Sequence, residues 1–166
     1  MIHPKRLTSR LAVVCLFASP GLPALAAPAF QALGEGAQVY ACQAAGGTFA
    51  WKLVGPDAVL TGADGQKLGR HFAGPSWQAP DGSTIVGEAV GSSPSPREGA
   101  VAWLVLRARS TAGPGLFSSV IFVTRTQTQG GVAPASGCDA GHVGQQARAP
   151  YSATYTFFTD PAASPH

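Results

Sequence analysis

The sequence predicts an all-β protein: a single antiparallel β-sandwich or small β-barrel of about eight or nine strands, following a signal peptide. Short segments that alternate apolar and polar residues, or that are rich in β-branched and aromatic residues, recur along the chain without helical periodicity. Turn-forming residues separate them at short intervals, with 21 Gly and 14 Pro among 166 residues. Charged residues make up only 11% of the chain, which favours a compact, turn-rich domain.

The first 26 residues have the pattern of a cleaved secretory signal peptide. A basic segment containing Lys5, Arg6 and Arg10 precedes an apolar run at 11–18, and small residues lead up to Ala26. The apolar run is too short to span a bilayer, which needs about 20 residues, so we expect no transmembrane segment. The expected location is therefore periplasmic or extracellular.

Without the signal peptide at 1–26, the chain at 27–166 has the size of one ordinary β domain. Its net charge falls from +3 to zero, because three of the 11 basic residues leave and all 8 acidic residues stay. With no basic stripe left, we expect no nucleic-acid partner. The sequence does not indicate an oligomeric state.

Cys42 and Cys138 are the two cysteines that remain after residues 1–26. An even pair in an exported chain favours one intramolecular disulfide. Closing so long a loop contributes about 4 to 5 kcal/mol to stability on the chain-entropy model. Two free thiols or half of a metal site are the alternatives.

The first expected strands surround glycine-containing turns. Residues 38–42 and 49–53 alternate between polar and apolar side chains, with Gly46 and Gly47 between them. Residues 58–60 form a further short apolar segment. Asp-Gly pairs then favour turns before strands at 66–72 and 83–90, with a brief strand between them at 76–78.

The later strands are longer and follow an exposed Pro/Ser loop at 91–99. Residues 101–108 are apolar on both alternating faces, and residues 116–126 are rich in β-branched and aromatic residues. Residues 151–159 alternate again. The intervening segment, 127–150, is long for a loop, and the disulfide is expected to pin it to the first strand.

Candidate binding residues gather at 64–87, where His71, Trp77, Asp81 and Ser83 stand among turns. The sequence favours a non-catalytic module that binds a small molecule, a glycan or a partner there. For the single residues, a core position for Trp77 and a structural His71 bonded to a turn are favoured, and the alternatives are an exposed stacking platform for Trp77 and a ligand or acid/base role for His71. Trp51 and Trp103 lie in apolar runs and are expected in the core.

A hydrolase or metal-dependent enzyme is the alternative from another class, and a structural envelope or stress-related role is the third. Catalysis would need His71 to meet Asp81, Glu88, Asp139 or His142. The chain has no His-X-His or His-Glu-X-X-His spacing, no Gly-X-Ser-X-Gly elbow and no Gly-rich phosphate loop that opens a helix. We therefore expect no metal and no cofactor, and whether the protein is an enzyme stays open.

Several phrases resemble the secreted bacterial and fungal family catalogued as domain of unknown function 3455. They are QVYAC at 38–42, WKL at 51–53, GRHFAGPSW at 69–77, DGS at 81–83 and PYSATY at 150–155. The resemblance covers nearly all of the chain after residue 26. It implies an exported β domain and brings no established activity.

Overall fold

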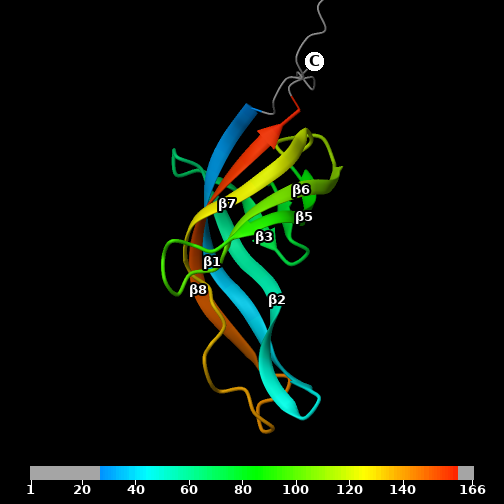
Figure 1. Cartoon of the computed structure of the whole chain (residues 1–166). Helices are drawn as coiled ribbons and strands as arrows, with labels where there is room; N and C mark the ends of the chain where they lie inside the picture. The colour runs from blue at the N-terminus through cyan, green and yellow to red at the C-terminus, as the bar shows by residue number, and fades with distance from the viewer. Residues whose placement is uncertain (1–26, 161–166) are drawn as a thin grey trace, which may run out of the picture.

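The computed structural model describes residues 27–160, which form a closed barrel of eight antiparallel strands (Figure 1). Each strand pairs with the next along the chain, and β8 pairs with β1 to close the ring. The all-β prediction is confirmed, and of the two expected architectures the structure is the barrel. The strands are β1 (Ala27–Ala45), β2 (Thr48–Thr61), β3 (Lys67–Phe72), β4 (Ser76–Gln78), β5 (Thr84–Ser93), β6 (Trp103–Ala112), β7 (Val120–Gly130) and β8 (Gln146–Thr159).

Two expected strands, at 49–53 and 58–60, are parts of the single strand β2. Gly55 and Pro56 do not interrupt it, because they keep their places in the ladder opposite Val39 and Gln38 of β1. The register shifts between Val39 and Tyr40, so that Val54 is an extra residue on β2. A β-bulge of this kind bends a strand without ending it.

Strand β1 begins at Ala27, well before the expected start at residue 38. Its first half contains Gly34 and Gly36, which weaken a strand pattern read from sequence alone. Packing explains the glycine at 34: a Cβ atom there would lie 2.6 Å from the ring of Tyr155. The first half of β1 is held by a ladder to β8 from Ala27 onward and by a second ladder to β2 from Leu33 onward.

The strand expected at 116–126 also begins later, because residues 116–119 form a turn and β7 starts at Val120. This turn places Phe117 in the barrel interior, where its ring packs against Phe30 and Phe157 at centroid distances of 6.0 and 5.2 Å. We call the end with Phe117 the closed end; it also carries the turns at 62–66 and 79–83.

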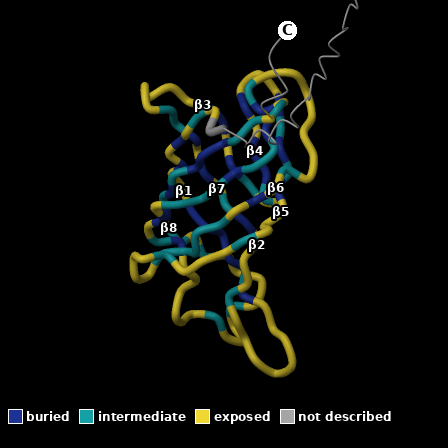
Figure 2. The backbone as a smooth tube through the Cα atoms, turned by 45° about the horizontal axis from the view of Figure 1, so that its top comes forward, coloured by how far each residue is buried: buried dark blue, intermediate teal, exposed yellow. Residues whose placement is uncertain are grey.

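The opposite end, which we call the open end, carries the turns at 73–75 and 94–102 and the loop at 131–145. There β1 and β2 project beyond the barrel as a long hairpin beside that loop (Figure 1). Buried residues follow the barrel wall, while the projecting segments are mostly exposed (Figure 2).

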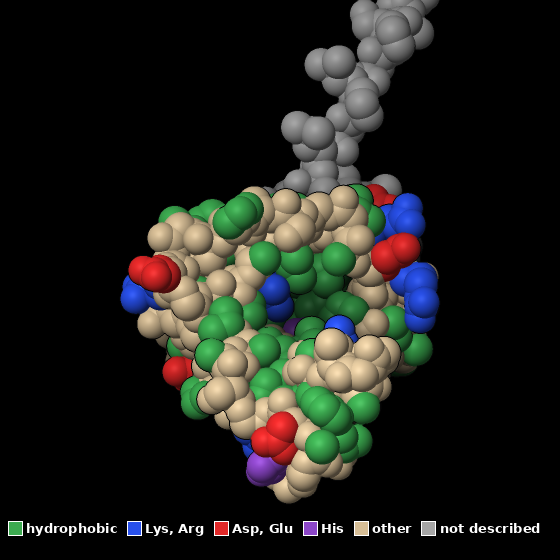
Figure 3. All heavy atoms as spheres, turned by 60° about the horizontal axis from the view of Figure 1, so that its bottom comes forward, with side chains coloured by type: hydrophobic (Ala, Val, Ile, Leu, Met, Phe, Trp, Pro, Cys, Tyr) green, Lys and Arg blue, Asp and Glu red, His purple; other side chains and the backbone are tan. Residues whose placement is uncertain are grey.

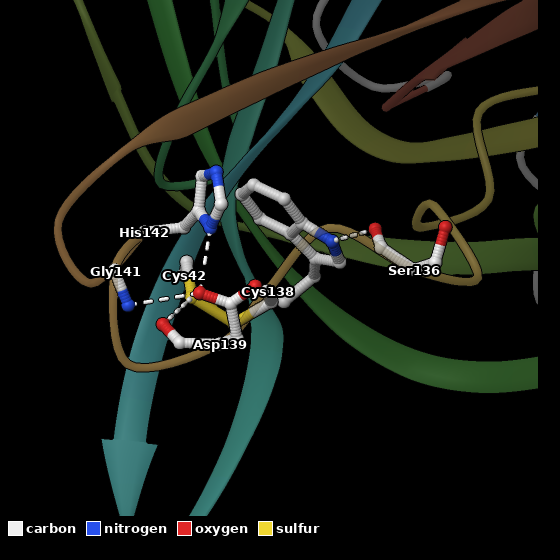
Figure 4. Close-up of a disulfide and its surroundings, with 7 residues drawn as sticks. Cys42, Ser136, Cys138, Asp139, Gly141 and His142 are labelled. Carbon is white, nitrogen blue, oxygen red and sulfur yellow. Dashed lines mark hydrogen bonds and ion pairs between the residues drawn. A yellow bond between two sulfur atoms is a disulfide. The ribbon is translucent and has the colours of Figure 1, made fainter.

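The predicted disulfide between Cys42 and Cys138 is confirmed and ties β1 to the loop at 131–145 (Figure 4). Backbone hydrogen bonds of 2.9 Å join Cys42 to Gln145 and to Gly144. The Trp51 indole donates to the carbonyl of Ser136 at 2.9 Å. The loop is therefore pinned at several points, of which the sequence predicted the disulfide.

The prediction that Trp51 and Trp103 lie in the core is wrong, because both side chains are only half-buried. Within residues 27–160, no helix has the length and apolar character that a membrane crossing requires. The predicted signal peptide at 1–26 lies outside the described residues.

Candidate binding site at the open end of the barrel

The barrel is hollow at its open end. Figure 3 looks into this hollow and shows mainly hydrophobic side chains around it, with a basic and a histidine side chain inside. We call it the mouth pocket; its volume is about 330 Å³. It is lined by Gln38, Leu53, Val54, Gly55, Pro56, His71, Gly74, Pro75, Ala89, Leu104, Leu106 and Arg125.

Gln38 is the most informative polar residue of the mouth pocket. It lies on β1 opposite Pro56 and Ala149, with 2% of its surface exposed. Its Nε2 atom is buried and has no hydrogen-bond partner among the described residues. A buried amide nitrogen without a partner costs about 1 to 3 kcal/mol. A ligand that supplies an acceptor in the pocket would remove this cost once a small rotation of the side chain turns Nε2 toward it.

His71 comes from β3, opposite Ala58 of β2 and Trp77 of β4, and is 2% exposed. Its Nδ1 lies 2.8 Å from the carbonyl oxygen of Ser76. Burial lowers the pKa of the imidazole to about 4, outweighing the opposing effect of the Ser76 carbonyl, and the charge of Arg125 lowers it further. A neutral ring that donates from Nδ1 keeps Nε2 as an acceptor.

Arg125 is the single basic residue among the described residues that line the mouth pocket. It lies on β7 opposite Leu104 and Tyr155. Its Nε and Nη2 atoms both donate to the carbonyl oxygen of Ala102, at 3.1 and 2.7 Å. Two bonds to one acceptor orient the guanidinium group but leave its charge in place.

Three tyrosines, Tyr40, Tyr151 and Tyr155, are the phenols on which the charge of Arg125 acts. The hydroxyl groups of Tyr151 and Tyr155 lie 3.0 Å apart, and the Tyr40 hydroxyl donates to the carbonyl of Gly131 at 2.7 Å. Burial raises the pKa of all three phenols, that of Tyr155 well above its usual value, although Arg125 acts in the opposite direction. At neutral pH these groups are therefore uncharged, and none neutralises Arg125.

The four candidate binding residues do not come together. His71 lines the mouth pocket, whereas Trp77 is fully buried and stacks on His71 at a centroid distance of 4.5 Å. Trp77 thus occupies the core position that the sequence favours over an exposed stacking platform. Its ring also meets the edges of Tyr155 and Phe157.

Asp81 and Ser83 lie at the closed end, where they fix a turn. One carboxylate oxygen of Asp81 accepts from the Ser83 hydroxyl at 2.6 Å and from its N–H at 2.8 Å. The other accepts from the N–H of Leu116 at 2.8 Å, and the Ser83 hydroxyl oxygen accepts from Phe117 N–H. The Ser83 hydroxyl is the largest cause of the lowered pKa of Asp81. The pair thus holds the turn that carries Phe117.

The partners that an enzyme built on His71 would require lie elsewhere. Glu88 pairs with Arg107 on exposed side chains. Asp139 pairs with His142 at 2.6 Å beside the disulfide (Figure 4), and this bond lowers the pKa of the carboxyl. The described residues include no group of three His, Cys, Asp or Glu side chains that could hold a metal ion.

Sequence reasoning missed Gln38 and Arg125. The available signal for Arg125 was a lone charge in the otherwise uncharged run LFSSVIFVTRT, at a position where the alternation of β7 points it inward. Gln38 gave no comparable signal, because an isolated polar residue in an alternating strand is normally read as solvent-facing.

These features define the class of protein: an eight-stranded antiparallel barrel, held by one disulfide, with a small pocket at one end. The family described as "Protein of unknown function (DUF3455)" matches residues 23–159, and the chain belongs to it. This confirms the resemblance seen in the sequence. No curated protein and no solved structure matches the chain.

Proposed function

We propose that this protein binds a small, largely apolar molecule in the mouth pocket, without chemical conversion. The observation that carries the proposal is the Nε2 atom of Gln38, a buried donor without a partner among the described residues, on a side chain that lines this hollow. Such a group adds affinity for a ligand that supplies an acceptor, and selects against one that does not.

The size and lining of the pocket support a small ligand. A volume of about 330 Å³ lies near the lower end of the range for small-molecule sites. Leu53, Val54, Leu104 and Leu106 supply apolar surface, while few polar groups converge on the interior. This balance of apolar walls and a few polar groups is typical of ligand pockets in barrel mouths.

We further propose that the protein works in the periplasm or outside the cell, after cleavage of a signal peptide at 1–26. The disulfide supports this, since such bonds persist mainly in oxidising compartments.

Fluorescence titration with 6-propionyl-2-(dimethylamino)naphthalene, a neutral apolar probe whose ketone oxygen accepts a hydrogen bond, tests binding in the mouth pocket. Ala89→Phe adds a ring to the pocket lining and is expected to weaken probe binding at least about tenfold, since it removes the space for the probe. Val90→Phe is the matched control, because Val90 is the next residue, is 53% exposed and does not line the pocket.

The proposal predicts saturable binding by the wild type and Val90→Phe, and weak binding by Ala89→Phe. Equal binding by all three proteins would place the probe outside the mouth pocket and contradict the proposal. So would an absence of saturable binding by the wild type.

A further inference from the structure

The mouth pocket carries a positive charge, on Arg125, that forms no ion pair with another described residue. Ion pairs between described residues join Arg107 to Glu88, His142 to Asp139 and Arg148 to Asp57, and none involves Arg125. The carbonyl of Ala102 accepts two hydrogen bonds from Arg125 but has no formal charge.

The other titratable groups on which Arg125 acts are neutral. They are His71 on β3, Tyr40 on β1, and Tyr151 and Tyr155 on β8. A half-buried cation beside apolar walls and neutral rings is poorly solvated, so an anion placed near it would be strongly favoured.

Gln38 adds a second donor to the same pocket. Its Nε2 is a free donor, the guanidinium of Arg125 has further N–H groups besides the two that donate to Ala102, and a carboxylate has two oxygens that accept such bonds. The apolar lining supplied by Leu53, Leu104 and Leu106 suits an uncharged hydrocarbon body.

We infer that the ligand is the anion of a small organic acid, with its carboxylate between Arg125 and Gln38 and its hydrocarbon part against the apolar lining. This inference rests on the proposed function and specifies the class of ligand. Arg125 supplies the countercharge, Gln38 a neutral hydrogen bond, and the pocket volume of about 330 Å³ limits the size of the hydrocarbon part.

Calorimetric titrations at pH 7 with two matched pairs test the inference: benzoate against benzamide, and hexanoate against hexanamide. Within each pair the hydrocarbon part is the same and the charge differs. We expect the acid of at least one pair to bind about 10- to 100-fold more tightly than its amide, the range for a hydrogen bond to a charged group.

Arg125→Gln is expected to remove this preference and leave the weaker binding of the amide. Arg107→Gln is the matched control, because Arg107 is exposed and paired with Glu88 outside the pocket, and it should keep the preference. Arg125→Lys, which retains the positive charge, should keep part of it.

Gln38→Glu tests the same point if Arg125→Gln does not fold. It preserves the shape of the side chain and places a carboxylate in the pocket, so the acid should lose its advantage. Equal binding of acid and amide by the wild type would overturn the inference and leave the proposed function standing. An acid preference that persists in both Arg125→Gln and Gln38→Glu would also overturn it. No binding of any of the four compounds would contradict the proposed function itself.

Discussion

The side chain of His71 connects the core of the barrel to the mouth pocket. Its ring stacks on Trp77 with an interplanar angle of 10° and meets Tyr155 edge-on, with 5.0 Å between centroids. Aromatic neighbours on these sides exclude water, which explains why the neutral form is favoured. The stability of the protein should therefore depend on pH through this residue.

The free energy of unfolding should fall as the pH decreases from about 6.5 to about 4. In this window the unfolded chain protonates His71 while the folded protein keeps it neutral, so acid favours unfolding. A shift from 6.5 to about 4 corresponds to a loss of about 3 kcal/mol. Urea denaturation at several pH values measures it.

His71→Gln should flatten the pH dependence between pH 6.5 and 4, although the variant loses ring packing and is less stable throughout. Val90→Gln is the control, because Val90 is 53% exposed and carries no titratable group, so the variant should keep the wild-type slope. The lowered pKa of Asp81 adds acid sensitivity only below about 3.8, outside this window. An unchanged slope in His71→Gln would show that burial of this ring does not control acid stability.

Individual residues were only partly predictable from the sequence. His71 stood out because histidines are rare in this chain, and the structure places it in the pocket lining. Asp81 and Ser83 stood out for their turn chemistry, which they use to hold the loop that carries Phe117. Arg125 was not recognised, because its importance depends on the absence of a nearby carboxylate, which only three-dimensional structure reveals.

At the scale of single elements, β1 determines how the barrel closes and what fits inside it. It pairs along most of its length with both β2 and β8. Turns such as Gly46-Gly47 were predictable because they depend on neighbouring residues. The first half of β1 was not, because its glycines are required by atoms of other strands: the Tyr155 ring at Gly34, and the backbone of Asp57 and Ala58 at Gly36.

Gly34→Ala should destabilise the protein by about 1 to 3 kcal/mol, the usual cost of overpacking. The added Cβ would lie 2.6 Å from the fully buried ring of Tyr155, which cannot move without disturbing the core. Gly91→Ala is the matched control, because a Cβ there meets Val105 at an ordinary 3.5 Å. Thermal denaturation measures the stability of the two variants. If Gly34→Ala is as stable as Gly91→Ala, the packing account of β1 is contradicted.

Removing the disulfide with Cys42→Ser and Cys138→Ser together should lower the free energy of unfolding by about 2 to 5 kcal/mol. The bond joins residues 96 positions apart and constrains the unfolded chain accordingly. Hydrogen exchange should show the loop at 131–145 opening first, since its backbone hydrogen bonds to Cys42, at Gln145 and Gly144, lie beside the removed disulfide. Unchanged stability and exchange in the double variant would mean that the remaining hydrogen bonds hold the loop alone.

At the scale of the whole molecule, the two ends of the closed barrel are packed differently. Phe117 closes one end with an aromatic cluster, while the other keeps a hollow with Arg125, Gln38 and His71 in its lining. Segments that alternate polar and apolar residues predicted an all-β domain. The choice between a sandwich and a barrel depended on the pairing of β1 with β8. No local pattern encodes that long-range pairing, nor the pocket that it creates.

The most direct test of the mouth pocket as the binding site is an NMR titration of the isotope-labelled protein with benzoate. We predict that the side-chain signals of Gln38 Nε2 and Arg125 Nε shift most and saturate together. Side-chain signals of Arg107 and Arg148, on the exposed surface, should stay in place. Saturable shifts confined to residues outside the pocket lining, or no saturable shift at all, would contradict this account.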